Sequence, residues 1–119
     1  MNRKFALSVF IALLLALTSC TPVRTAPEYA SRAGELVDSG DKGRALEVLR
    51  EGIYRYPDDY ELNIMMARTI LSYYTDLTPR ARSRYLARYY LKRAASVAPD
   101  MERADSARQE YALIRDMQR

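Results

Sequence analysis

The sequence predicts an all-α fold, and three observations lead to this prediction. Apolar residues after position 26 recur at intervals of three and four, the spacing of one face of an α-helix. Capping residues, prolines and glycines divide this pattern into segments of helical length. No segment after residue 19 has the pattern of a confident strand. With 119 residues, 49% of them hydrophobic, the chain has room for one core.

The first helix is predicted to begin at Thr25. A capping hydroxyl there stands three residues before the carboxylate of Glu28, and Pro27 lies near the first helical position. Ser39-Gly40 is expected to end the helix. Its buried face is expected to consist of Tyr29, Ala33, Leu36 and Val37.

Asp41 is the expected N-cap of the second helix, which Tyr56-Pro57 ends. Gly52 lies on the apolar face of this helix, where glycine costs about 1 kcal/mol of helix propensity relative to alanine. We therefore expect it to allow a neighbouring helix to approach closely. Asp58 and Glu61 resemble a capping box for a third helix.

A proline in each of the two remaining turns marks the last helices. Thr78-Pro79 is expected to open the fourth helix, and Ala98-Pro99 to close it. Asp100 then caps a fifth helix. Its apolar seam comprises Ala104, Ala107, Tyr111, Ile114 and Met117.

The N-terminus has the features of an export signal. Arg3 and Lys4 precede thirteen residues, Phe5 to Leu17, among which Ser8 is the only polar one. A helix of thirteen residues rises about 20 Å, whereas the hydrocarbon core of a bilayer is about 30 Å thick. A cleaved signal peptide is therefore favoured over a permanent transmembrane span.

The single cysteine follows this run directly. Leu17-Thr18-Ser19-Cys20 resembles a bacterial lipobox, which implies that Cys20 receives a diacylglycerol group and becomes the first mature residue. This lipid would hold the chain on a membrane. Because Thr21 rather than aspartate follows, the resemblance favours the periplasmic face of the outer membrane over the inner membrane. An ordinary signal peptide with a cysteine near its end is the alternative.

The helical part contains an internal repeat. Aligning Pro57 with Pro99 pairs small and large positions in the two halves: Ala45 with Ala87, Leu49 with Leu91, and Gly52 with Ala94. These positions resemble the tetratricopeptide repeat, a helix-turn-helix unit of 34 residues that stacks into a superhelix. The resemblance implies about two such units and a C-terminal capping helix. The second unit departs from the pattern, with eight extra residues and Asn63 where the first has an aromatic residue, Tyr29.

The chain is thereby divided into a signal peptide at 1–19, a lipidated tether at 20–26 and a helical domain at 27–119. At least three repeats are usually needed for independent stability. Either the long last helices compensate for the missing repeat, or a second copy or a partner completes the core.

The resemblance also implies a partner-binding groove lined by the first helix of each unit. Carried over residue by residue, this groove comprises Ala30, Gly34, Val37, Ile64, Arg68 and Leu71. The other interpretation of its apolar members is that they form the core, with the fifth helix folded into the groove.

A basic stripe is the most unusual feature of the sequence. Its four members, spaced four residues apart on the fourth helix, are Arg80, Arg84, Arg88 and Lys92. One interpretation is an anionic partner, such as lipid headgroups, an envelope polymer or an acidic protein. The other is neutralisation within the chain by acids of the next helix, namely Glu102, Asp105, Glu110 and Asp116.

The composition argues against an enzyme. The chain has no histidine and one cysteine, which removes imidazole catalysis, internal disulfides and cysteine-rich metal sites. We expect no metal, no cofactor beyond the lipid and no nucleic-acid ligand. The predicted function is a lipid-anchored periplasmic scaffold that binds a protein partner. The alternative is a structural envelope lipoprotein that binds an anionic polymer or lipid through helix 79–93.

Overall fold

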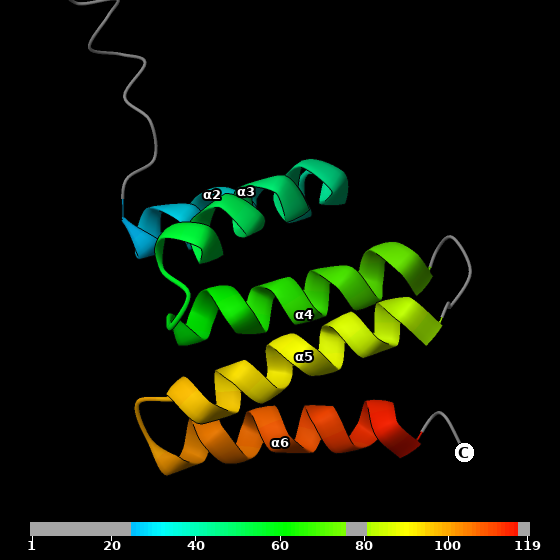
Figure 1. Ribbon diagram of the computed structural model, residues 1–119. Helices are drawn as coiled ribbons and strands as arrows, with labels where there is room; N and C mark the ends of the chain where they lie inside the picture. Colours follow the sequence, from blue (N-terminus) through cyan, green and yellow to red (C-terminus); the bar gives the residue numbers. More distant parts are fainter. Residues whose placement is uncertain (1–24, 76–80, 117–119) are drawn as a thin grey trace, which may run out of the picture.

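Five α-helices make up the residues that the computed structural model describes, 25–75 and 81–116 (Figure 1). They are α2 (Ala26–Asp38), α3 (Lys42–Arg55), α4 (Tyr60–Thr75), α5 (Ala81–Val97) and α6 (Met101–Asp116). These residues contain no strand, so the all-α prediction is confirmed. The predicted signal peptide, Cys20, the start of the fourth helix at Thr78-Pro79 and Met117 lie outside the described residues.

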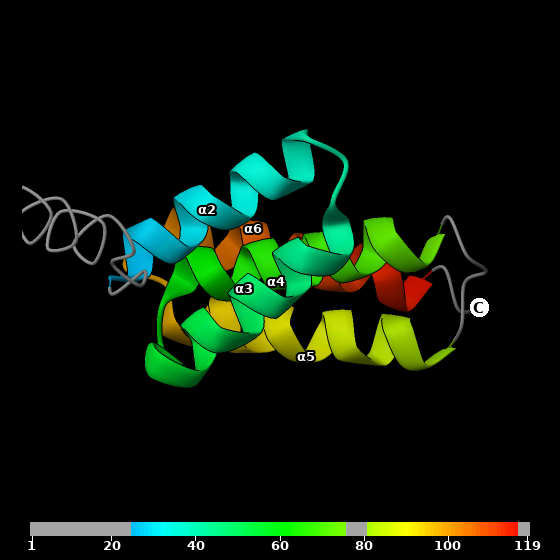
Figure 2. The ribbon, with the colours of Figure 1, turned by 90° about the horizontal axis from the view of Figure 1, so that it is seen from above.

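The helices stack as successive hairpins. Each helix packs on the one before it in the chain, and α4 also contacts α2. The hydroxyl of Tyr60 on α4 donates a hydrogen bond of 3.2 Å to the carbonyl oxygen of Arg103 on α6. Helices α2, α4 and α6 therefore follow one another along one side of the stack. Seen from above, α2 and α5 lie on opposite sides, with α4 between them (Figure 2).

Three of the expected helix caps are confirmed. Side-chain oxygens of Thr25, Asp41 and Asp100 accept the backbone N–H three residues further on, at 3.3, 3.2 and 2.8 Å. These bonds satisfy donors that the first turn of a helix leaves free. Gly40, with φ of 84°, follows α2 in the left-handed region.

The cap of α4 lies one residue later than predicted. Leu62 donates its backbone N–H to Asp59 Oδ1 at 2.9 Å, and the helix begins at Tyr60. The prediction of Asp58 with Glu61 as a capping box is therefore wrong. The turn after α3 is one residue longer than expected. Its hydrogen bond from the Asp59 N–H to the Tyr56 carbonyl, at 3.2 Å, keeps Asp58 within the turn, so that Asp59 caps the helix.

The closest packing in the first hairpin is between Tyr29 on α2 and Gly52 on α3. A Cβ at Gly52 would lie 2.9 Å from both Cβ and Cγ of Tyr29, and 3.2 Å from Leu62 Cδ1. The Tyr29 ring is only 1% exposed, and its hydroxyl donates to Glu51 Oε1 at 3.0 Å. This confirms the expected role of Gly52 in helix approach.

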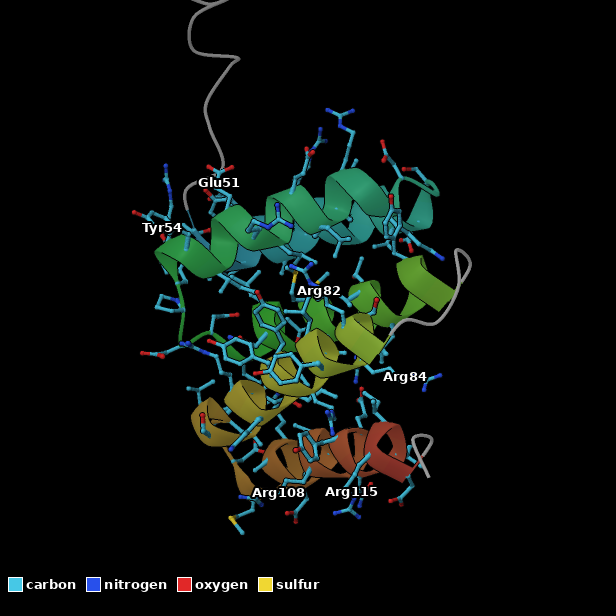
Figure 3. All side chains as sticks on the ribbon, turned by 45° about the vertical axis from the view of Figure 1, so that its right-hand side comes forward. Glu51, Tyr54, Arg82, Arg84, Arg108 and Arg115 are labelled. Atoms are coloured by element: carbon cyan, nitrogen blue, oxygen red, sulfur yellow. The ribbon has the colours of Figure 1, made fainter. Side chains whose placement is uncertain are left out.

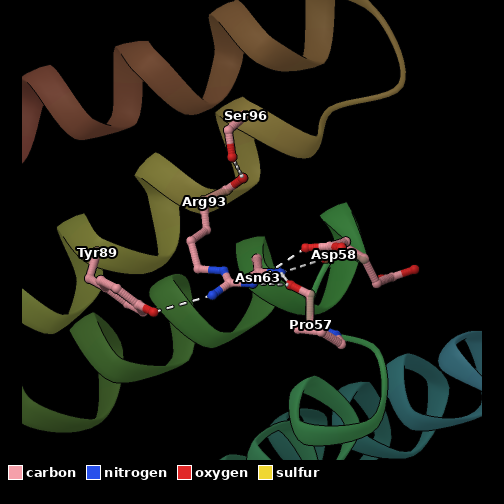
Figure 4. Close-up of polar contacts among 7 residues, drawn as sticks. Pro57, Asp58, Asn63, Tyr89, Arg93 and Ser96 are labelled. Atoms are coloured by element: carbon pink, nitrogen blue, oxygen red, sulfur yellow. Dashed lines mark hydrogen bonds and ion pairs between the residues drawn. The ribbon is translucent and has the colours of Figure 1, made fainter.

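The second unit has different residues at the positions of Tyr29 and Gly52. Asn63 and Ala94, at the positions that match Tyr29 and Gly52, are both fully buried. Asn63 donates through Nδ2 to the carbonyls of Pro57, at 3.1 Å, and Asp59, at 2.7 Å (Figure 4). The departure from the aromatic pattern is therefore a buried amide that closes the turn before its own helix.

The last helix packs on α5 and covers part of this end of the stack. α6 buries Ala104, Ala107 and Ile114, while most of its remaining side chains are exposed or half-buried. This is the arrangement expected of a capping helix. None of the helices within residues 25–75 and 81–116 is long and apolar enough to span a bilayer.

We expect Gly52→Ala to destabilise the protein. Overpacking a core typically costs about 1–3 kcal/mol and the gain in helix propensity is about 1 kcal/mol, so a net loss of up to about 2 kcal/mol should appear in urea unfolding. Gly34→Ala on α2 is the matched control, because its Cβ would meet only Met65 Cε at 4.0 Å. It should be neutral or stabilising by up to about 1 kcal/mol. Equal effects of the two substitutions would contradict this account of Gly52.

The buried Tyr29 hydroxyl should make stability fall at alkaline pH. Burial, and then the hydrogen bond to Glu51, raise the pKa of Tyr29 above its ordinary value of 10.0. The folded state therefore holds this proton more tightly than the unfolded state, so the contribution is complete below about pH 10 and is lost as pH rises through the folded pKa. Urea unfolding between pH 8 and pH 11 measures this fall.

Tyr29→Phe should flatten that alkaline decline, because it keeps the ring and removes the titrating group. Tyr54→Phe is the control, since Tyr54 is 88% exposed and should leave the pH profile as it is. The interpretation fails if the Tyr29→Phe protein loses stability with pH as steeply as the parent.

Candidate partner-binding surfaces

The residues predicted to line the partner groove lie on α2 and α4, and they differ in exposure. Ala30, Gly34 and Val37 on α2 and Leu71 on α4 are half-buried, whereas Arg68 is exposed. Ile64 is 1% exposed and belongs to the core, so it offers almost no surface to a partner. Helix α6 borders this surface without filling the whole length of it, since α2 lies at the far end of the stack (Figure 1).

Arg68 is held by α6 in a two-point ion pair. Its Nη2 lies 2.6 Å from Glu110 Oε1, and its Nε donates to Oε2 at 3.3 Å. The hydrogen bond to Glu110 raises the pKa of the Arg68 guanidinium. The Arg68 side chain is more than half exposed, so the pair contributes little to stability, about 0–1 kcal/mol. Its main effect is to set how α6 lies beside α4.

A cavity of about 320 Å³ opens between α4 and α6 on this side. Charges of both signs surround it, including Glu61 and Arg68 from α4 and Glu102 and Arg103 from α6. Such mixed charge favours no single sign of ligand. The α2–α4–α6 side is therefore a polar surface with a few apolar side chains such as Met65 at half exposure.

The basic stripe lies on the side of α5 that borders α6. Arg84 and Arg88 are half-buried and Lys92 is exposed, while Arg80 lies outside the described residues. Figure 3 shows Arg84 on α5 and Arg108 on α6. The stripe is thus positioned where acids of α6 were expected to neutralise it.

That expected neutralisation does not occur in the described residues. Glu110 pairs with Arg68, on the face of α6 that meets α4. Asp105 pairs with Arg108 at 2.9 Å, and Asp116 with its neighbour Arg115 at 3.2 Å. The fourth acid, Glu102, lines the cavity beside α4. The rotation of α6 thus places Glu110 and Glu102 toward α4, while Asp105 and Asp116 pair with arginines of α6 itself.

Two adjoining cavities follow the line between α5 and α6. The larger, of about 380 Å³, is lined by Leu91, Lys92, Ala95, Ser96, Arg108 and Tyr111. The smaller, of about 230 Å³, is lined by Tyr85, Arg88, Tyr89, Lys92 and Tyr111. Because Lys92 and Tyr111 border both, we treat them as one depression and call it the α5–α6 groove.

A polar clasp fixes one wall of the α5–α6 groove (Figure 4). Arg93 donates through Nη2 to the Pro57 carbonyl at 3.0 Å and lies 3.4 Å from Asp58 Oδ1. Its Nη1 donates to the Tyr89 hydroxyl at 3.3 Å. The Tyr89 ring also meets the Tyr90 ring edge to face, with centroids 5.1 Å apart. Tyr89 is thereby held at the groove although it is partly exposed.

Sequence reasoning did not find this groove as a site. It assigned Tyr111 to an apolar seam and gave no role to Arg108, Tyr85 or Tyr89. The available signal was the coincidence of tyrosines and basic residues at positions 85, 88, 89 and 92 on one side of one helix. The contribution of α6 depends on how that helix is rotated, which the spacing of its residues does not determine.

The described residues contain no group of three or more acidic, histidine or cysteine side chains that could hold a metal ion. No family model matches this chain, and neither a curated protein nor a solved structure matches it.

Proposed function

We propose that this chain is a lipid-anchored scaffold that binds a protein partner at the periplasmic face of the outer membrane and performs no chemistry itself. The observation that carries the proposal is the stack of hairpins, which exposes long faces of several helices together. Resemblance of the sequence to tetratricopeptide repeats supports the same function. Scaffolds of this architecture bind through such extended surfaces.

The anchor would place this surface close to the membrane. The cap of α2 is Thr25, five residues after Cys20, and five extended residues reach at most about 18 Å. Each acyl methylene in the bilayer contributes about 0.8 kcal/mol, so two or three chains would hold the domain there stably. A partner bound on the α2–α4–α6 side would therefore be recruited to the membrane surface.

Membrane attachment is tested by Cys20→Ser. We expect the parent chain to incorporate radioactive palmitate and to sediment with outer membranes. The variant should do neither and should keep the helical circular dichroism of the parent domain, because the described helices begin only at Ala26. Palmitate incorporation by the Cys20→Ser protein would contradict lipidation at this residue.

Partner binding is tested by purifying a C-terminally tagged chain from envelopes in mild detergent. We expect a stoichiometric protein partner that stays bound in 0.5 M NaCl, because salt screens exposed charges and leaves apolar contacts largely unchanged. Gly34→Arg should reduce its recovery, since the new side chain would project from the predicted groove. Gln109→Arg, on an exposed position of α6, is the matched control. Recovery of the chain without any protein partner, at low as at high salt, would refute the scaffold function.

A further inference from the structure

The α5–α6 groove lies where the stacking pattern would continue. Helix α5 packs against α4 and reaches the turn that ends α3, through the bond from Arg93 to the Pro57 carbonyl. If the stack continued, a further helix would pack against α6 as α5 packs against α4. It would also contact α5 as α5 contacts the turn after α3. The structure describes no such helix after α6, which is the last helix of the stack (Figure 1). Both cavities of the groove lie between the last two helices.

The charge of the groove specifies the kind of occupant. Its lining includes three cations, Arg88 and Lys92 from α5 and Arg108 from α6, and no carboxylate. Arg108 has Asp105 as a partner at 2.9 Å, whereas Arg88 and Lys92 form no ion pair with any described residue. The groove therefore has a net positive charge that a negatively charged ligand would balance.

The buried part of Arg88 is a second sign of an incomplete site. Its Nε is enclosed by the protein and has no hydrogen-bond partner among the described residues. A buried donor without an acceptor costs free energy, so such atoms are rare in folded proteins. No described residue forms a hydrogen bond or ion pair with the Arg88 guanidinium, so its outer N–H groups can donate to an acceptor oxygen of a ligand.

The apolar part of the groove favours a peptide over a simple anion. Ala95 is half-buried between the two helices above the fully buried Leu91, and the rings of Tyr85, Tyr89 and Tyr111 line the same groove. Tyr85 is 63% exposed, which leaves its ring available for contact. Tyrosine and arginine are enriched in protein interfaces. Arg88 lines only the smaller cavity and Arg108 only the larger, with Lys92 in both, so the cations follow the length of the groove.

We propose that the α5–α6 groove is the docking site for an acidic amphipathic helix of a partner protein. The proposal rests on the scaffold function proposed above. The apolar face of the helix packs on Ala95, Tyr111 and the exposed ring of Tyr85, as the next helix of the stack would. Arg88 and Lys92 are four residues apart, or about 6 Å along α5, so carboxylates spaced three or four residues apart on the partner match them.

A displayed library of random peptides tests this proposal even while the partner is unidentified. The purified domain lacking residues 1–19 and carrying Cys20→Ser is used for selection in 0.1 M NaCl. We expect enriched peptides to carry Asp or Glu at helical spacing beside apolar residues and to become helical when bound. Failure to enrich any peptide, or enrichment of peptides without acidic residues, overturns the proposal.

Three variants locate the binding of one enriched peptide, labelled with fluorescein. Arg88→Gln with Lys92→Gln should weaken its affinity about tenfold or more, because both cations lose their charge at the interface. Ala95→Trp should block the groove, and circular dichroism shows whether this variant remains folded. Arg82→Gln is the matched control: it removes an exposed charge from the same helix, but Arg82 lines neither cavity (Figure 3). Equal affinities of the parent and the Arg88→Gln, Lys92→Gln protein overturn the proposal.

Other occupants give distinct results. A dimer that the enriched peptide dissociates would identify a second copy of the chain as the occupant. Salt-sensitive binding to phosphatidylglycerol vesicles or to an anionic envelope polymer, lost with Arg88→Gln and Lys92→Gln while no peptide is enriched, would identify a lipid or polymer. Either result overturns the acidic helix.

The scaffold function and the docking site can fail separately. An envelope partner that copurifies equally with the parent and with the Arg88→Gln, Lys92→Gln protein would support the scaffold and refute the groove. Enriched acidic helices that bind the groove, with no envelope partner recovered, would refute only the scaffold function.

Discussion

The contact between Tyr29 and Gly52 is the constraint on which the first hairpin and its neighbour depend. Because Gly52 lacks a side chain, α3 approaches so closely that the Tyr29 ring is enclosed between the two helices. Leu62 of α4 packs beside the same spot, with its Cδ1 3.2 Å from where a Cβ of Gly52 would lie. Gly52 thus sets the separation of α2 and α3, and it also makes room for Leu62 of α4, the first helix of the second unit.

In the second unit, the positions that match Tyr29 and Gly52 hold other residue types but remain buried. Where the large ring is replaced by Asn63, the matching glycine is replaced by Ala94, and both positions stay buried. The Asn63 amide forms hydrogen bonds that an aromatic ring could not, since it and Arg93 both donate to the Pro57 carbonyl. This turn therefore connects α3, α4 and α5, which a purely apolar pair of residues could not do.

Local signals in the sequence predicted where the helices begin and end. They did not predict how one helix is rotated against the next. Caps such as Thr25 and Asp100 act within one turn of chain, so spacing alone identifies them. The shift from Asp58 to Asp59 depends on how the turn packs. Arg84, Arg88 and Lys92 of the basic stripe lie on one helix as predicted, but the sequence left open whether α6 neutralises them, because the rotation of α6 follows from which small residues it buries. The lipid anchor and the partner groove remain predictions.

The order of the helices along the stack also sets a distance. Packed helices lie about 8–10 Å apart, so α6 is about 16–20 Å from α2, two steps along the side that they share with α4. A chain attached to the bilayer through its N-terminus would thus hold α2 and α6 at different heights above the membrane. The domain would then act as a spacer, presenting the open end of the stack beyond the layer of lipid headgroups, where a large soluble protein can approach without steric conflict with the membrane.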